Sequence, residues 1–250
     1  MNQTQYKQFY EQVGRLNGWN FSHVKCTTKG VLWDFYGEVA ARCGPSDILL
    51  DIGTGGGEAL LTIADSALLL IGIDNAAGML ETANANIEQS GKSNVRLLPM
   101  DADQSLDFPD SFFNIVSNRH CSFLASEVCR VLCSNGCFLT QQVCEGDKQN
   151  LKQAFGRGQA FGVSDGTLLK QYQVELLEAG FRSVQSFEYD AIEYYHRAED
   201  LIFLLKHTPI IPNFGQDEND FAILERFIAD NQTQQGIRTN AKRFMIIATK

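Results

Sequence analysis

The fold class follows from the segment ILLDIGTGGGEALL, residues 48–61. It begins with a short apolar run, passes through a glycine-rich segment, and continues into a helical pattern from Glu58. A strand, a tight turn and a helix in this order are typical of the first crossover of an α/β sheet, where nucleotides bind. Glycines let the backbone turn sharply and approach a ligand closely. The sequence therefore predicts a nucleotide-type ligand at this turn.

Outward from this stretch, short apolar runs alternate with helical patterns along most of the chain. The runs are residues 47–52, 68–73, 95–99, 114–117, 137–143, 182–189 and 244–249. Apolar strands separated by helices are typical of a largely parallel sheet that is covered on both faces. We therefore expect an α/β, doubly wound fold with a mostly parallel, seven-stranded sheet.

The glycine-rich turn does not match the common phosphate-binding motifs. In GxGxxG the third glycine would fall on Glu58 or Leu60, and no lysine follows the glycines as in a phosphate-binding P-loop. Asp51 and Glu58 flank the turn, so that a polyanion is disfavoured and a cationic group is favoured. Asp74 ends the next strand, where an acid can accept hydrogen bonds from ribose hydroxyls. A nucleoside with a positive charge and no phosphate fits this pattern, and S-adenosylmethionine is such a molecule.

Four segments in order and register carry a resemblance to a known family. They are residues 48–61, GIDNAAGMLETA (72–83), MDADQSLDFPDSFFNIVSNRH (100–120) and EVCRVLCSNGCFLTQQV (127–143). Together they resemble the successive motifs of class I S-adenosylmethionine-dependent methyltransferases, in the branch that includes many small-molecule methyltransferases. The resemblance covers about residues 30–145 well and the last strands loosely, and it implies a Rossmann-like methyltransferase fold.

The resemblance also implies a set of cofactor-binding residues. Gly53, Thr54 and Gly55 would line the methionine end of the cofactor, with Asp51 near its ammonium group. Asp74 would bind the ribose, Asn75 and Met79 would border the adenine, and Asp101 and the backbone of Ala102 would read the adenine edge. Asn118 would lie under the sulfonium group. Met79 also fits the apolar face of its helix, where it would serve only the core.

The same resemblance organises the chain as a single methyltransferase domain, residues 1–250. Residues 1–29 would form an N-terminal flap or cap, residues 30–145 the cofactor-binding half, and residues 146–250 the substrate-side half with an insertion at about 190–240. The N-terminal and C-terminal helical decorations are expected over the carboxyl edge of the sheet. Tyr6, Phe9 and Tyr10 fit a flap over the cofactor and equally an amphipathic helix packed on the sheet.

His120 is the best candidate for a catalytic base, because it directly follows the strand end that should reach the methyl group. A histidine that only holds the loop would look the same. Arg119 could pair with a substrate carboxylate or with a nearby acid, and His196 lies in the expected decoration over the pocket. An Asn/Asp-Pro-Pro-Tyr motif, typical of transfer to an amide or adenine amine, is absent at residues 117–120.

Composition restricts partners and location. The 250 residues carry a formal charge of −9, which disfavours nucleic acid as the main partner. The longest apolar run, residues 67–73, is far below the roughly 20 residues that cross a bilayer, and the N-terminus lacks the apolar stretch of a signal peptide. We expect a cytoplasmic protein with no membrane partner. The sequence leaves its oligomeric state undetermined.

The seven cysteines include no CxxC pair, so we expect buried thiols and no metal site. The leading hypothesis is methyl transfer from S-adenosylmethionine to a small-molecule substrate, with S-adenosylhomocysteine as product. Because the donor is already activated, proximity and orientation would supply most of the acceleration, with general-base help where the acceptor must lose a proton. The alternatives are methylation of a protein or RNA acceptor and a non-catalytic S-adenosylmethionine-binding protein.

Overall fold

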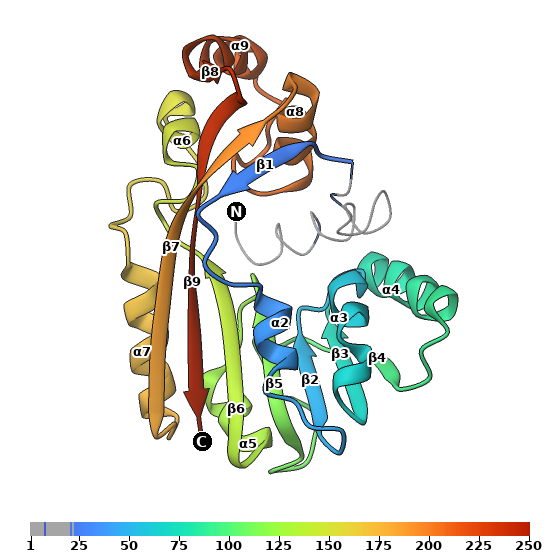
Figure 1. Cartoon of the computed structure of the whole chain (residues 1–250). Coiled ribbons are helices and arrows are strands. Elements are labelled where there is room, and N and C mark those ends of the chain that lie inside the picture. The colour runs from blue at the N-terminus through green and yellow to red at the C-terminus, as the bar shows by residue number, and fades with distance from the viewer. Residues whose placement is uncertain (1–7, 9–20, 22) are drawn as a thin grey trace.

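The computed structural model describes residues 8, 21 and 23–250, in which a central sheet carries helices on both faces (Figure 1). Five neighbouring strands run parallel in the order β4-β3-β2-β5-β6. They are β2 (Ile48–Ile52), β3 (Leu69–Asp74), β4 (Val95–Pro99), β5 (Phe113–Arg119) and β6 (Leu132–Val143). Next to β6 lies the antiparallel β9 (Gly236–Thr249), followed by β7 (Ser183–Tyr195). The predicted doubly wound α/β fold is confirmed.

Successive strand residues point to opposite faces and build two separate cores. Leu49 and Leu70 pack on the face covered by α2 (Phe35–Ala40) and α3 (Glu58–Thr62). Leu50 and Ile71 pack on the opposite face, which is covered by α5 (Ala125–Val131) and α7 (Thr167–Glu178). This alternation explains the continuous apolar runs, since both faces of each strand are buried.

The strands β7 and β9 are longer than the rest and continue past the end of the parallel strands. The last β6 pair joins Val143 to Arg243, whereas β7 stays paired with β9 up to Tyr195 and Ile237. Two short strands extend the sheet to nine: β1 (Cys26–Lys29) pairs with the end of β7, and β8 (Gln232–Thr233) pairs with the start of β9. The expected count of seven describes the central strands and omits these two, which are too short to stand out in the sequence.

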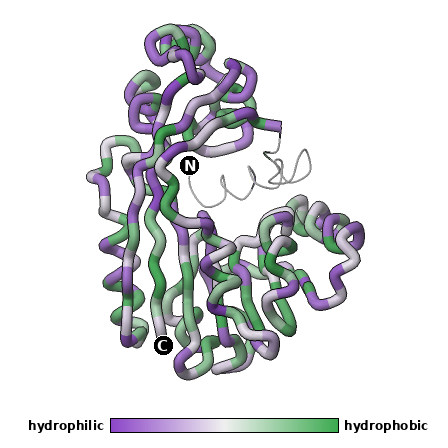
Figure 2. Tube along the Cα trace, in the orientation of Figure 1, coloured by the Kyte–Doolittle hydropathy of each residue, from purple (hydrophilic) through white to green (hydrophobic). Residues whose placement is uncertain are grey.

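Three helices join this extension: α6 (Gln149–Phe155), α8 (Ala198–His207) and α9 (Asp220–Asn231). With β1, β8 and the paired ends of β7 and β9 they form what we call the cap, which lies beyond the carboxyl ends of the parallel strands (Figure 1). The cap has its own apolar core, including Leu151, Leu201, Leu224 and Ile237. Its outer segments are largely hydrophilic, whereas hydrophobic residues follow the central strands (Figure 2).

Some predicted boundaries change in the structure. The predicted strand 182–189 continues to Tyr195, and the predicted strand 244–249 begins at Gly236. The helical stretch predicted from Glu58 to Ala67 divides into α3 and a 3-10 turn, η1 (Ala64–Ser66). The remaining helix is α4 (Ala77–Ser90), which follows β3. None of the helices that the structure describes is long and apolar enough to span a bilayer.

Candidate functional site

The glycine-rich turn is held against the end of β3 by backbone hydrogen bonds. The Gly53 and Thr54 N–H groups both donate to the Ile73 carbonyl, at 2.9 and 3.1 Å. Gly53 and Gly55 have φ angles of 72° and 57°, in the left-handed region that glycine adopts without strain. A Cβ added at Gly53 would lie 2.4 Å from the Cβ of Cys121, so that the space admits only glycine. The backbone conformation of this turn is therefore fixed by its hydrogen bonds and by the requirement for glycine.

Asp51 is fully buried beneath the turn and accepts hydrogen bonds from three hydroxyl groups. Ser117 Oγ donates at 2.6 Å, Tyr36 OH lies 3.3 Å from both carboxylate oxygens, and Thr54 Oγ1 makes a short contact. Burial raises the pKa of Asp51 to about 6, although these donors and Arg119 act in the opposite direction. Asp51 thus ties the turn to β5 and α2.

Asp74, at the end of β3, holds the same turn from the other side. Its Oδ2 accepts from the Gly55 N–H and its Oδ1 from the Ala76 N–H, each at 2.9 Å. Burial raises the pKa of Asp74 despite these donors. A carboxylate oxygen has two lone pairs, so each oxygen can still accept a hydroxyl hydrogen.

A cavity of about 330 Å³ opens above the turn. It brings together six of the residues that the resemblance assigned to the cofactor: Gly53, Thr54, Gly55, Asp74, Asn75 and Met79. His120, the candidate base, also lines it, as do Glu58 and Arg119. Among the described residues, Arg119 has no carboxylate partner, and its guanidinium lies 5.8 Å from the centre of the Tyr36 ring.

Four other assigned residues lie outside the lining of this cavity. Asp51 is below the turn, as described. Asp101 follows β4 and accepts from the Asp103 N–H at 3.1 Å, and Ala102 is buried with its carbonyl bonded to the Leu124 N–H. Asn118 is fully buried in the sheet, where its Oδ1 accepts from Thr140 at 2.8 Å and from Gln142 at 2.7 Å.

His120 follows β5 in the left-handed conformation, with φ at 60°. Its hydrogen bonds assign the ring proton. Trp33 Nε1 can only donate, and it donates to Gln141 Oε1 at 2.7 Å, which turns the Gln141 amide nitrogen toward His120 Nε2 at 3.2 Å. His120 Nε2 is therefore the acceptor, and the neutral ring carries its proton on Nδ1. Burial and the nearby Arg243 and Arg119 keep the pKa of His120 well below its usual value.

A second cavity, of about 190 Å³, lies between the carboxyl edge of the sheet and the cap. His120 and Phe21 line both cavities, so that the two spaces meet at His120. The second cavity is lined by apolar residues of the cap, such as Leu204 on α8, and by charged groups. Val143, at the end of β6, and Arg243, its partner on β9, line the inner wall.

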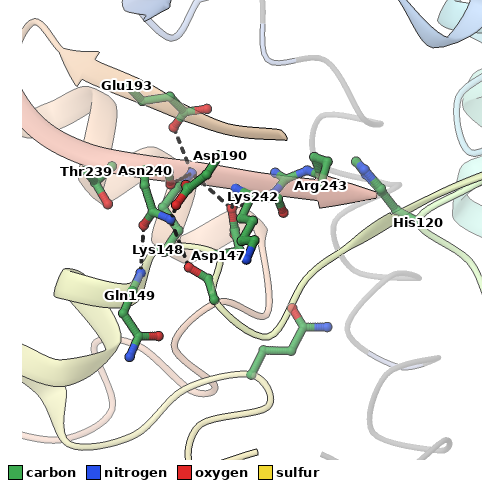
Figure 3. A network of polar contacts seen from close by, with 12 residues as sticks. His120, Asp147, Lys148, Gln149, Asp190, Glu193, Thr239, Asn240, Lys242 and Arg243 are labelled. Atoms are coloured by element: carbon green, nitrogen blue, oxygen red, sulfur yellow. Dashed lines mark hydrogen bonds and ion pairs between the residues drawn. The ribbon is translucent and has the colours of Figure 1, made fainter. Parts of the chain in front are cut away.

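The charged groups of the second cavity form three ion pairs, one of them between Lys148 Nζ and Asp147 Oδ1 at 3.8 Å (Figure 3). Lys148 Nζ lies 2.7 Å from Glu193 Oε2, and Arg243 Nη1 lies 2.5 Å from Asp147 Oδ1. Tyr195 OH also donates to Glu193 Oε2, at 2.8 Å. Burial is offset by the cations Arg243 and Lys148, which keep the pKa of Asp147 below its usual value. In Figure 3, Arg243 lies between this network and His120.

Sequence reasoning missed the charged residues of this second cavity. Asp147 and Lys148 follow β6, so their place at the carboxyl edge of a parallel strand was a usable signal. Arg243 lies on the antiparallel β9, and only the register with β6 brings it to this edge. Cys121 was also missed in the first cavity. Burial raises the pKa of its thiol to about 12, which keeps it protonated and poorly nucleophilic.

Other candidates from the sequence lie elsewhere. His196 is exposed, and its Nε2 lies 2.8 Å from Thr27 Oγ1 at the β1–β7 pair, away from both cavity linings. The predicted flap residues Tyr6, Phe9 and Tyr10 lie outside the described residues. Within the described part of the chain, all seven cysteines are free, and no group of three or more His, Cys, Asp or Glu is placed to hold a metal ion.

Comparison with known proteins supports the methyltransferase resemblance that the sequence motifs suggested. Residues 49–136 match the family model of a methyltransferase domain. A search of curated protein sequences gives no match. Among solved structures, a protein from Bacillus halodurans C-125 described as a proposed methyltransferase is 20% identical, with a TM-score of 0.59, over 86% of this chain and 96% of its own.

Two further structures show how widely the fold is used. A functionally unknown protein from Deinococcus radiodurans R1 is 12% identical, covers 99% of both chains and has a TM-score of 0.59. The [4+2]-cyclase SpnF is 20% identical, with a TM-score of 0.56, over 86% of this chain and 79% of its own. At these identities the structures show the fold alone, and the methyltransferase-domain model matches residues 49–136, about a third of the chain.

Proposed function

The chain carries the methyltransferase domain and the fold of class I S-adenosylmethionine-dependent methyltransferases, and from that premise we propose that it methylates a small-molecule acceptor. It is an enzyme that uses S-adenosylmethionine. The single observation that carries the proposed acceptor class is the pair of cavities joined at His120. The first would take the cofactor and the second, beneath the cap, a small acceptor, so that donor and acceptor would meet at His120.

The first cavity fits the cofactor in shape and in charge. Gly53 and Cys121 both line this cavity, and a side chain at position 53 would clash with Cys121. Asp74 has lone pairs left for the two ribose hydroxyls, and Asn75 and Met79 line the same space for the adenine. At the methionine end, Arg119 would pair with the carboxylate, while Glu58 and the buried Asp51 would favour the ammonium group.

When bound, the cofactor supplies a sulfonium methyl group that is already activated for transfer. The chain's own part is then to hold the acceptor in line and to exclude water, which contributes on the order of 7–11 kcal/mol in favourable systems. His120 would act at the boundary of the cavities as a neutral group that donates a hydrogen bond from Nδ1. Its Nε2 lone pair is taken by Gln141, so that general-base help would require the opposite tautomer.

Release of S-adenosylhomocysteine tests this proposal. The purified protein with S-adenosylmethionine is offered pools of small hydroxyl, amine, thiol and carboxylate compounds, and in parallel cell protein and RNA fractions. We expect turnover with one or more small-molecule pools, above the release seen without acceptor. Turnover only with protein or RNA would overturn the acceptor class. Tight cofactor binding with no release in any fraction would favour the non-catalytic alternative.

A further inference from the structure

The second cavity contains an arginine whose hydrogen-bonding capacity the protein uses only in part. Both hydrogens of Arg243 Nη1 are taken, one by Asp147 Oδ1 and one by the Lys242 carbonyl at 2.9 Å. Within the described part of the chain, Nε and Nη2 have no partner. Among the described residues, every fully buried polar side-chain atom has a hydrogen-bond partner. Because Nε and Nη2 have none, they are not fully buried, and 16% of the Arg243 side chain is exposed. The space that Arg243 lines is the second cavity.

The open edge of Arg243 is suited to one kind of ligand group. Nε and Nη2 donate two parallel hydrogen bonds, a geometry that matches the two oxygens of a carboxylate. The Nη1 bonds to Asp147 and to the backbone hold the guanidinium, so that little side-chain freedom is lost when a ligand binds. A neutral hydroxyl or an ester could use only part of this edge.

The charged groups that line the second cavity balance one another, so the open edge of Arg243 decides which ligand charge is favoured. Lys148 pairs with Glu193, and Arg243 pairs with Asp147, so these four groups balance. Arg119 lines the first cavity together with Glu58 and Asp74 and would pair there with the cofactor carboxylate, so it adds no surplus charge to the second cavity. A cationic group would be repelled by the open edge of Arg243, and a doubly charged phosphate would bring a second negative charge close to Asp147 and Glu193.

We propose that the acceptor carries a carboxylate, which binds the Nε–Nη2 edge of Arg243 and directs the rest of the molecule past His120 to the first cavity. The inference rests on the proposed function, because it assigns the second cavity to the acceptor. Arg243 lies between the ion-pair network and His120 (Figure 3), so an acid held there reaches toward the cofactor.

Binding to the protein loaded with S-adenosylhomocysteine tests this without requiring turnover. The probes are small carboxylic acids, such as hydroxybenzoates, aminobenzoates and hydroxyphenylacetates, each with its methyl ester, together with phosphate monoesters of similar size. We expect at least one acid to bind, about tenfold to a hundredfold more tightly than its ester, from charge-assisted hydrogen bonds. Equal binding of acids and esters, preference for phosphates, or no binding of any acid would overturn the proposal.

Two variants assign that preference to Arg243. Arg243→Lys keeps a cation beside Asp147 and removes the two-nitrogen edge, so acid affinity should fall to that of the ester while S-adenosylhomocysteine affinity stays within about twofold. The double variant Asp147→Asn/Arg243→Gln removes both charges together and avoids a buried unpaired carboxylate. Arg182→Lys is the matched control, because Arg182 is exposed and bonds Asn135 at 2.8 Å away from the cavity. An unchanged acid preference in Arg243→Lys would contradict the assignment.

The binding and turnover readouts separate the two proposals. Release of S-adenosylhomocysteine with neutral acceptors only, and no acid preference, would leave methylation of small molecules standing and remove the carboxylate inference. Selective acid binding without methylation of any small molecule would keep the carboxylate site and contradict the proposed function.

Discussion

Asp74 has two roles: it fixes the glycine-rich turn, and its carboxylate oxygens keep lone pairs that can accept from a ligand. Its carboxylate accepts hydrogen bonds from the Gly55 and Ala76 N–H groups. A loss of cofactor affinity in Asp74→Ala could therefore come from a lost ribose contact or from a loosened turn, and this variant alone does not distinguish the two. A pair of ligands that differ only in the ribose hydroxyls makes that distinction within one variant.

We therefore predict that the unmodified protein binds adenosine at least about tenfold more tightly than 2′,3′-dideoxyadenosine, because Asp74 accepts from the hydroxyls. In Asp74→Ala both ligands should bind with equal, weak affinity in titration calorimetry. Asp65→Ala, which removes an exposed partner of Lys92, serves as the control and should keep the preference. Preference for adenosine in Asp74→Ala would remove Asp74 from the ribose site.

His120 gives a pH prediction with a definite sign. Its pKa is lowered by burial and by Arg243 and Arg119, so the ring is already neutral well below pH 6.5. The turnover rate should then show no rise between about pH 6 and 7.5 from titration of this histidine. Because Asp51 has a pKa of about 6, the control is the same profile in His120→Asn; a rise near the usual histidine pKa that is present in the unmodified protein and absent in this variant would contradict the neutral state.

The same residue can be tested by two substitutions. His120→Asn supplies an N–H donor near the Nδ1 position and tolerates the left-handed backbone, so it should retain turnover within about tenfold. His120→Ala should lose more, because it removes the donor. If both variants lose ~10²–10⁴-fold alike, His120 acts as the general base and the tautomer argument is wrong.

At the scale of elements, the sequence predicted what depends on local pattern. The apolar runs of β2, β3 and β5 and the glycine turn after β2 follow from composition and spacing alone, and six of the assigned cofactor residues meet in one cavity. The cap was harder to predict from the sequence, because β7 and β9 extend there beyond the ends of the parallel strands. Their ends, residues 190–195 and 236–243, mix polar and apolar residues without a continuous apolar run, and most of them fall within the predicted insertion at about 190–240.

The second cavity could not be predicted, because it depends on pairing between distant segments. Arg243 reaches the carboxyl edge through its register with Val143, 100 positions earlier in the sequence (243 − 143), and Glu193 reaches it through β7. Asn118 shows the converse case: the resemblance of segment 100–120 suggests a ligand contact, while Thr140 and Gln142 on β6 donate to its side-chain oxygen.

At the scale of the whole molecule, the sheet holds one cavity over its glycine turn and the cap closes a second beside it. We propose that these cavities have separate roles: the first binds the cofactor and the second binds the acceptor, with His120 between them. A substitution that blocks one cavity and leaves the other open tests this assignment. Leu204 on α8 lines only the second of these two cavities, and Leu177 on α7 is 56% exposed and supplies a control for the same substitution.

The most direct measurement compares the turnover rate and S-adenosylhomocysteine affinity of Leu204→Trp and Leu177→Trp. An indole in the second cavity should displace the acceptor, so we predict that Leu204→Trp loses at least about tenfold in turnover at a fixed subsaturating acceptor concentration, while its affinity for S-adenosylhomocysteine stays within about twofold. Leu177→Trp should keep both. A folded Leu204→Trp protein with normal turnover, or one whose loss of turnover follows an equal loss of S-adenosylhomocysteine affinity, would contradict separate cofactor and acceptor cavities.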